Sequence, residues 1–149
     1  VSQDIAPEAR LGLFGYLGRE RPENVRNKMW MLGADATFSL AGRFELNLQY
    51  VERRDTNPEF VVNPLEKVMT RGGFAELVYL PRGDDSRLYT ASLFNWVDSD
   101  QRDLRYTSAT FHAGYLLRRN VRLTAEATYV FRSDFGRHLR LGSGLILGF

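Results

Sequence analysis

The 149-residue sequence predicts an all-β protein, an antiparallel up-and-down β-barrel with about eight recognisable strands in one domain, 1–149. Three observations predict this fold. Apolar and polar residues alternate with a period of two in one segment after another. Each segment has about 10–12 residues, and the links between segments alternate between short turns and longer polar connections. Such a series of hairpins is typical of an up-and-down barrel.

The alternation is clearest in the last two segments, 121–132 and 138–149. In each of them one face is almost wholly apolar and the other is almost wholly polar or glycine, with Ser143 as the one polar residue on the apolar face. The residues expected on the apolar face are Val121, Leu123, Ala125, Ala127, Tyr129 and Phe131, followed by Leu139, Leu141, Leu145, Leu147 and Phe149.

The earlier strands follow the same pattern less regularly. The strand near 9–18 is rich in glycine, and the sequence leaves its facing open. The strand near 87–97 is ambiguous, because Tyr89 and Leu93 lie on one face while Phe94 and Trp96 lie on the other. The remaining strands are expected near 29–40, 43–53, 70–80 and 105–117.

The links suggest a direction for the barrel. Short turns are expected at Ala41-Gly42, Pro81–Ser86 and Arg118–Asn120, and longer links at Glu20–Asn27, Asp55–Val68, Asp98–Leu104 and Ser133–Gly136. Membrane barrels have short turns on the periplasmic side and longer loops outside. By that rule both termini would be periplasmic. The barrel is either closed by this chain alone or the C-terminal part of a larger barrel.

Composition excludes several other classes. A net charge of +2 and dispersed arginines argue against a nucleic-acid partner. The absence of cysteine excludes disulfides and thiolate metal sites. No apolar run reaches the roughly 20 residues of a transmembrane helix. The mean hydropathy of -0.33 suits a strand that shows lipid at every second residue. The chain begins at Val1 without an initiator Met or a signal peptide, so we expect a mature or truncated product.

Aromatic residues favour a membrane barrel over a soluble one. They fall near the strand ends, where two interfacial girdles of amphipathic rings are expected. The apolar faces also contain alanines, whose small side chains can face lipid but would not fill a soluble core to native density. A soluble barrel with its apolar face inside remains the alternative. The expected girdles are Trp30, Tyr50, Tyr129 and Phe131 at the outer rim, and Phe44, Tyr79, Tyr89, Tyr115 and Phe149 at the periplasmic rim.

The polar face carries charges of both signs along the strands. In a narrow barrel they would pair across the lumen, and in a wide one they would line water. In a soluble barrel they would form the solvated outside. The candidate lumen-lining residues are Asp35, Glu45, Glu76, His112, Arg122, Glu126 and Arg140.

The last strand, Leu141-Gly142-Ser143-Gly144-Leu145-Ile146-Leu147-Gly148-Phe149, resembles the C-terminal signature of bacterial outer-membrane β-barrel proteins. Residues 114–126 resemble the penultimate hairpin of porin-like barrels. The resemblance implies that Leu145, Leu147 and Phe149 form a signal read by the barrel-assembly machinery. It implies a bacterial outer-membrane location, with contacts to outer-membrane lipids and lipopolysaccharide. Other envelope proteins are further candidate partners.

The sequence offers no constellation for catalysis, and we expect neither an enzyme, a metal site nor a cofactor. His112 lies among small polar residues on the lumen face, and His138 lies near the outer end of the last strand. Neither has a nearby carboxylate triplet, so a metal site is a weak hypothesis. Two functions remain open: a porin-like channel or part of a barrel wall, and a small plugged eight-stranded barrel that serves as an anchor, a scaffold or a partner-binding protein.

Overall fold

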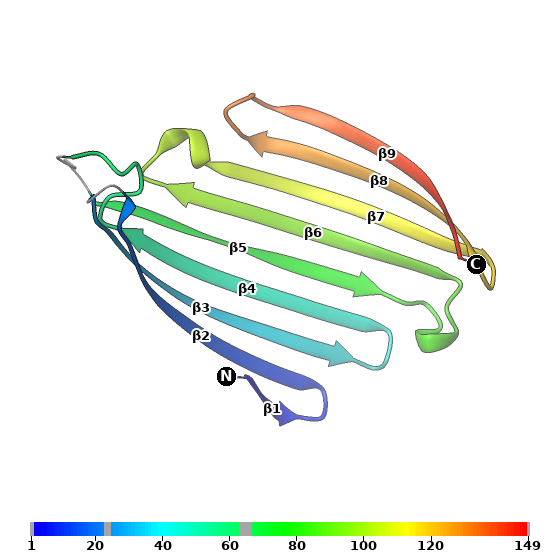
Figure 1. Cartoon of the computed structure of the whole chain (residues 1–149). Coiled ribbons are helices and arrows are strands. Elements are labelled where there is room, and N and C mark those ends of the chain that lie inside the picture. Colours follow the sequence, from blue (N-terminus) through cyan, green and yellow to red (C-terminus); the bar gives the residue numbers. More distant parts are fainter. Residues whose placement is uncertain (1, 23–24, 63–66, 149) are drawn as a thin grey trace.

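A computed structural model describes residues 2–22, 25–62 and 67–148. They form one antiparallel sheet in which every strand pairs with its neighbours in sequence, in the order β1 to β9 (Figure 1). The 3-10 helices η2 (Gly83–Asp85) and η3 (Arg102–Leu104) lie in the described connections. The strands are β1 (Ser2–Ala6), β2 (Ala9–Glu20), β3 (Asn27–Leu40), β4 (Phe44–Asp55), β5 (Val68–Tyr79), β6 (Leu88–Ser99), β7 (Tyr106–Arg118), β8 (Val121–Arg132) and β9 (His138–Leu147).

The eight strands that the alternation predicts correspond to β2–β9, so the all-β, antiparallel, up-and-down arrangement is confirmed. β1 was not predicted. It has only five residues, and two of them, Gln3 and Asp4, are polar neighbours that hide any apolar periodicity. It is ordered through its register with β2, in which Gln3 lies opposite Leu11 and Asp4 lies opposite Arg10.

The sheet is curved but open. β1 and β9 are its two edges, lie on opposite sides of the molecule, and do not pair within the described residues (Figure 1). A barrel requires enough curvature and stagger to bring the first strand beside the last. A barrel closed by this chain alone is therefore not what the structure has, and the expectation is corrected to an open nine-stranded sheet.

The connections gather at two ends of the sheet, which we call the short-turn end and the long-loop end. The short-turn end holds residues 7–8, 41–43, 80–87 and 119–120, and the long-loop end holds the described residues 21–22, 25–26, 56–62, 67, 100–105 and 133–137. The predicted alternation is present. The link 80–87 is the exception in length, because it contains η2.

Alternation and register sort the side chains into two faces. One face, the apolar face, has no charged residue on the described parts of β2–β6 and β9 from the row of Tyr50, Gly73 and Trp96 down to the short-turn end. On β7 and β8 the register places Arg132 in that row and Arg118 beside the last short turn, each at a bulge. Its large side chains are solvent-exposed, including Leu141 at 75% and Leu17 at 87%. The opposite face, the charged face, carries most of the mid-strand charges.

The described strands form a single layer without a hydrophobic core. Among the described residues, Val130 is the only buried hydrophobic side chain. The accessible surface is 11027 Å², whereas a compact globule of this mass would expose about 7,800 Å². The buried polar strand residues Asn27, Asp55, Ser99 and Ser108 lie on the charged face, which is therefore the more crowded of the two. The apolar face is left uncovered.

Candidate functional site: the charged face

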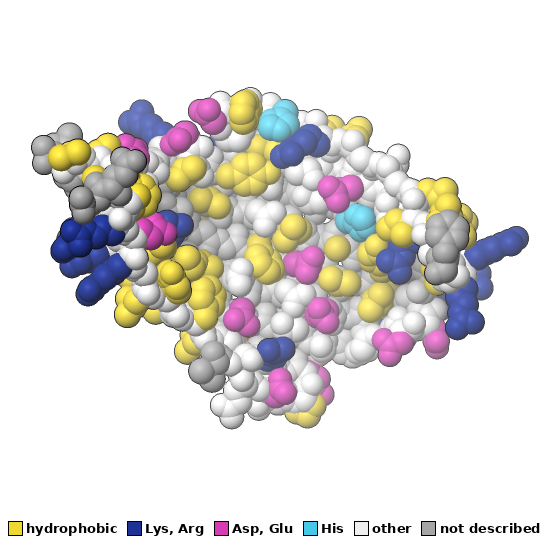
Figure 2. Space-filling model, in the orientation of Figure 1, with side chains coloured by type: hydrophobic (Ala, Val, Ile, Leu, Met, Phe, Trp, Pro, Cys, Tyr) yellow, Lys and Arg dark blue, Asp and Glu magenta, His cyan; other side chains and the backbone are white. Residues whose placement is uncertain are grey.

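The structure brings the seven predicted lumen residues together on the charged face. Register places Asp35 opposite Gln49, and His112 opposite Glu126. Figure 2 shows acidic side chains and the histidines spread over this face, with the larger groups of Lys and Arg at the two ends of the sheet and single ones between. The alternation therefore sorted these residues to one side, and the structure adds which of them touch.

An acidic cluster lies across β3, β4 and β5. The Asn47 amide donates to Glu45 Oε1 at 2.9 Å and to Glu76 Oε2 at 3.2 Å. Its carbonyl oxygen accepts from Thr37 Oγ1 at 2.9 Å. One amide thus joins two carboxylates that would otherwise only repel each other. The cluster presents negative charge in the middle of the face.

A second cluster surrounds His112 on β7. Its Nδ1 lies 3.4 Å from Glu126 Oε2, and its Nε2 lies 3.1 Å from the Tyr89 hydroxyl. A carboxylate only accepts, so in the neutral imidazole Nδ1 donates to Glu126 and Nε2 accepts from Tyr89. The Arg122 guanidinium lies over the Tyr89 ring, 5.2 Å from its centroid. His112 is thus oriented by two partners, as a structural polar residue would be.

Asp35 and Arg140 have simpler surroundings. The Asp35 carboxylate covers Gly12 of the neighbouring strand, where a larger residue would collide with it. Arg140 Nη2 donates to the Tyr106 hydroxyl at 3.2 Å. Asp35, Glu45 and Glu76 belong to β3–β5, whereas Arg122 and Arg140 belong to β8 and β9, together with Glu126 on β8.

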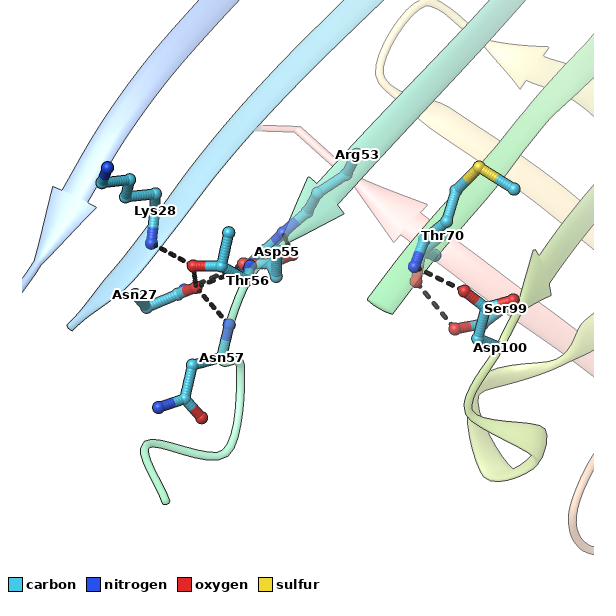
Figure 3. A network of polar contacts seen from close by, with 10 residues as sticks. Asn27, Lys28, Arg53, Asp55, Thr56, Asn57, Thr70, Ser99 and Asp100 are labelled. Carbon is cyan, nitrogen blue, oxygen red and sulfur yellow. Dashed lines mark hydrogen bonds and ion pairs between the residues drawn. The ribbon is translucent and has the colours of Figure 1, made fainter. Parts of the chain in front are cut away.

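The charged face ends at the long-loop end in a buried polar network (Figure 3). Asn27 starts β3, and its side-chain amide donates to Asp55 Oδ1 at 3.0 Å. Arg53 donates two hydrogen bonds of 2.7 and 2.9 Å to the same carboxylate. The Asn27 side-chain oxygen Oδ1 accepts hydrogen bonds from the backbone N–H groups of Thr56 and Asn57 at 3.2 and 2.9 Å. This network holds the start of the 56–67 connection against the sheet.

The neighbouring hairpin is held in the same way. Thr70 and Ser99 share a hydroxyl–hydroxyl bond of 2.7 Å, and the Met69 N–H donates to Asp100 Oδ2 at 2.8 Å (Figure 3). Asp98 lies within 4 Å of the guanidinium groups of Arg71, Arg105 and Arg132. The long loops therefore leave the sheet from a rigid polar rim.

The aromatic residues partly follow the prediction. Phe44 and Tyr79 stack on the apolar face near the short turns, with ring centroids 4.6 Å apart. Tyr89 differs from the prediction: it lies opposite Gly114 on the charged face, where its hydroxyl meets His112. The sequence could not assign the face on which Tyr89 lies, because residues 88–97 are apolar on both faces of the strand. The other described members of the predicted girdles, all on the apolar face, are Trp30, Tyr50, Tyr115, Tyr129 and Phe131.

Rings also occur away from the strand ends. Phe94 and Phe111 lie near mid-strand on the apolar face, and Trp96 approaches Tyr50 with centroids 6.1 Å apart. In the predicted assembly signal, Leu145 lies opposite Leu123 and Leu147 lies opposite Val121, both on the apolar face. Phe149, the third member, lies outside the described residues.

Sequence reasoning missed the partners that organise the charged face. Asn47, Thr37 and Tyr106 are ordinary polar residues in strands, and only the register between strands shows what they contact. It also missed a group of cations on the other face at the long-loop end, including Arg19, Lys28 and Arg54. Within each strand these cations occupy the same alternate positions as the apolar residues, and this pattern could have placed them on the apolar face.

In the described part of the chain, no group of three or more His, Asp or Glu side chains is placed to hold a metal ion. No helix in that part is long and apolar enough to cross a membrane. Comparison with known protein families, with curated proteins and with solved structures found no match to this chain.

Proposed function

We propose that this sheet is the wall of a transmembrane β-barrel of the bacterial outer membrane, with the apolar face against lipid and the charged face lining a porin-like channel. The single observation that carries the proposal is the uncovered apolar face. A soluble monomer rarely exposes more than a few hundred Å² of contiguous apolar surface. Here the face extends over β2–β9 with no second layer above it.

The dimensions support a membrane. On β3 the apolar face runs from Trp30 to Leu40, roughly 33 Å along the strand at about 3.3 Å per residue. With a strand tilt of about 40° this run spans about 25 Å, the height of the apolar band of an outer-membrane barrel. Charged residues return on the same face at the long-loop end, where Glu52 and Arg54 on β4 lie opposite Leu32 and Trp30. The charged residues of this end are Arg19, Lys28, Glu52, Arg54, Arg71, Asp98 and Arg132.

The openness of the sheet supports a wall wider than this chain. Nine strands curve without meeting, so further strands, from the same protein or from other copies, would complete the ring. A wide ring leaves an aqueous lumen, in which the acidic and basic side chains of the charged face would contact solute. The assembly machinery and outer-membrane lipids would be its partners.

Refolding of the chain into lipid vesicles, followed by planar-bilayer recording, tests the proposal. We expect β-type circular dichroism only in detergent or lipid, and steady conductance steps. A monodisperse protein in detergent-free buffer would overturn the membrane assignment. Membrane insertion without conductance would instead favour a plugged barrel, in which large side chains of the charged face such as Phe14, Phe74 and Tyr89 fill the lumen.

A further inference from the structure

At the long-loop end of the apolar face lies a hollow of about 710 Å³ between β2, β3, β4 and the start of β5. Four cationic side chains line it: Arg19, Lys28, Arg54 and Lys67. All four are exposed, and they come from four different segments that only the fold brings together. Trp30 lies among them.

Among the described residues, these cations are only partly paired with carboxylates. Arg54 is paired with Glu52 at 2.9 Å, and Asp55 at the rim is already held by Arg53 at 2.7 Å. In the part of the chain that the structure describes, Arg19, Lys28 and Lys67 have no ion pair within 4 Å. Counted over the described residues, the hollow therefore has a net charge of about +3.

The register makes this arrangement costly without an anion. Arg19 lies directly opposite Lys28 on the neighbouring strand, and like charges in that position destabilise a sheet. Lys28 points its side chain away from the polar network beside it, as Figure 3 shows. Arg54 is held above the Trp30 ring, 5.1 Å from its centroid, so one cation is fixed in place by stacking and by Glu52 together. A bound anion would convert the repulsion into attraction.

Two apolar hollows adjoin the cationic one and share residues with it. One, of about 460 Å³, is lined by Leu17, Trp30 and Leu32, and the other, of about 380 Å³, by Leu13, Leu32 and Tyr50 among others. Leu17 and Leu32 are 87% and 57% exposed. A free phosphate would not contact these grooves, whereas an anionic lipid would place its headgroup among the cations and its acyl chains along the leucines.

We propose that Arg19, Lys28, Arg54 and Lys67, with Trp30, form a binding site for the phosphate-bearing headgroup of a membrane lipid. The inference rests on the proposed function, because it needs the apolar face to lie in a bilayer. Basic residues at a membrane surface attract anionic headgroups, and an interfacial Trp spans the boundary between headgroups and acyl chains.

The test uses the fluorescence of Trp30 to report lipid binding at this site. The chain has two tryptophans, so Trp96→Phe leaves Trp30 alone. The protein is refolded in phosphatidylcholine vesicles that contain increasing fractions of brominated phosphatidic acid or, in parallel, brominated phosphatidylcholine. We expect stronger quenching by the phosphatidic acid. Arg19→Gln/Lys28→Gln should weaken that preference roughly ten- to thirty-fold, while leaving the circular dichroism unchanged.

The matched control is Arg118→Gln/Arg119→Gln, which removes two cations from the short-turn end and should keep the preference. Equal quenching by both lipids would overturn the headgroup site while leaving the membrane assignment intact. No quenching by either lipid would overturn both proposals. Full competition by millimolar inorganic phosphate would also overturn the lipid site, because it would indicate a site for free anions.

Discussion

At the scale of single residues, the position of the Tyr89 side chain requires a glycine at position 114. Gly114 lies opposite Tyr89, and a Cβ at position 114 would overlap the Tyr89 ring. Gly142 lies on the same charged face of β9 and has open space around it. The two glycines therefore form a matched pair for testing whether the Tyr89–His112 contact exists.

We expect Gly114→Ala to destabilise the protein by about 1–3 kcal/mol, because the Tyr89 ring must move and its bond to His112 is lost. Gly142→Ala should change the free energy of unfolding by less than about 0.5 kcal/mol. Urea unfolding in vesicles, followed by tryptophan fluorescence, measures both. Equal effects at the two positions would contradict the placement of Tyr89 on the charged face.

The Asp55 carboxylate is the centre of the rim network. Its side chain is 6% exposed and accepts hydrogen bonds from Arg53 and Asn27. Asp55→Ala leaves both donors without their acceptor, which typically costs about 1–3 kcal/mol. Glu52→Ala breaks the more exposed pair with Arg54 and should cost no more than about 1 kcal/mol. The same unfolding measurement compares them, and a reversed order would count against the network.

At the scale of elements, the β3–β4 turn contains a strained residue. Ala41 and Gly42 have φ values of 52° and 61°, and the Arg43 N–H donates to the Leu40 carbonyl at 3.1 Å. Two central residues with positive φ are the signature of a type I′ turn, which matches the twist of a hairpin. Glycine adopts this backbone freely, whereas alanine does so at a cost.

Ala41→Asn creates the Asn-Gly pair that type I′ turns prefer, and we expect it to stabilise the protein by about 0.5–1 kcal/mol. Ala41→Val should destabilise it, because a β-branched residue tolerates positive φ poorly. Unfolding midpoints in urea give both values. Destabilisation by Asn would indicate a different turn.

The elements also explain which parts of the fold are predictable. β8 and β9 are apparent in the sequence because one face of each is apolar at every position except Ser143. β6 is not, because Leu93 and Val97 on the charged face are as apolar as Phe94 and Trp96 opposite. The register with β5 and β7 decides the facing of Tyr89, and a single strand contains no information about it.

At the scale of the whole molecule, the question is which medium covers the apolar face. Leu141 and Gly142 are neighbours in the middle of β9 and point to opposite faces. Leu141 is 75% exposed and Gly142 has nothing packed above it. If water covered both faces, a lysine would be tolerated at either position.

In lipid vesicles we expect Leu141→Lys to destabilise the folded protein by about 2–4 kcal/mol, the cost of a basic side chain near the bilayer midplane. Gly142→Lys should have an effect of less than about 1 kcal/mol, because the charged face meets water. Folding yield and urea unfolding in vesicles measure the difference. Equal tolerance at both positions would refute the membrane wall.

The sequence by itself determined the class, the strands β2–β9, the positions of the turns and the set of charges that share a face. It could do so because period-two alternation and turn chemistry are local properties of the chain. Only the tertiary structure decided the open edges of the sheet, the side of Tyr89, the partners of His112 and Asn47, and the cationic hollow around Trp30. These depend on curvature and on register between strands, which are set by contacts between residues far apart in the chain.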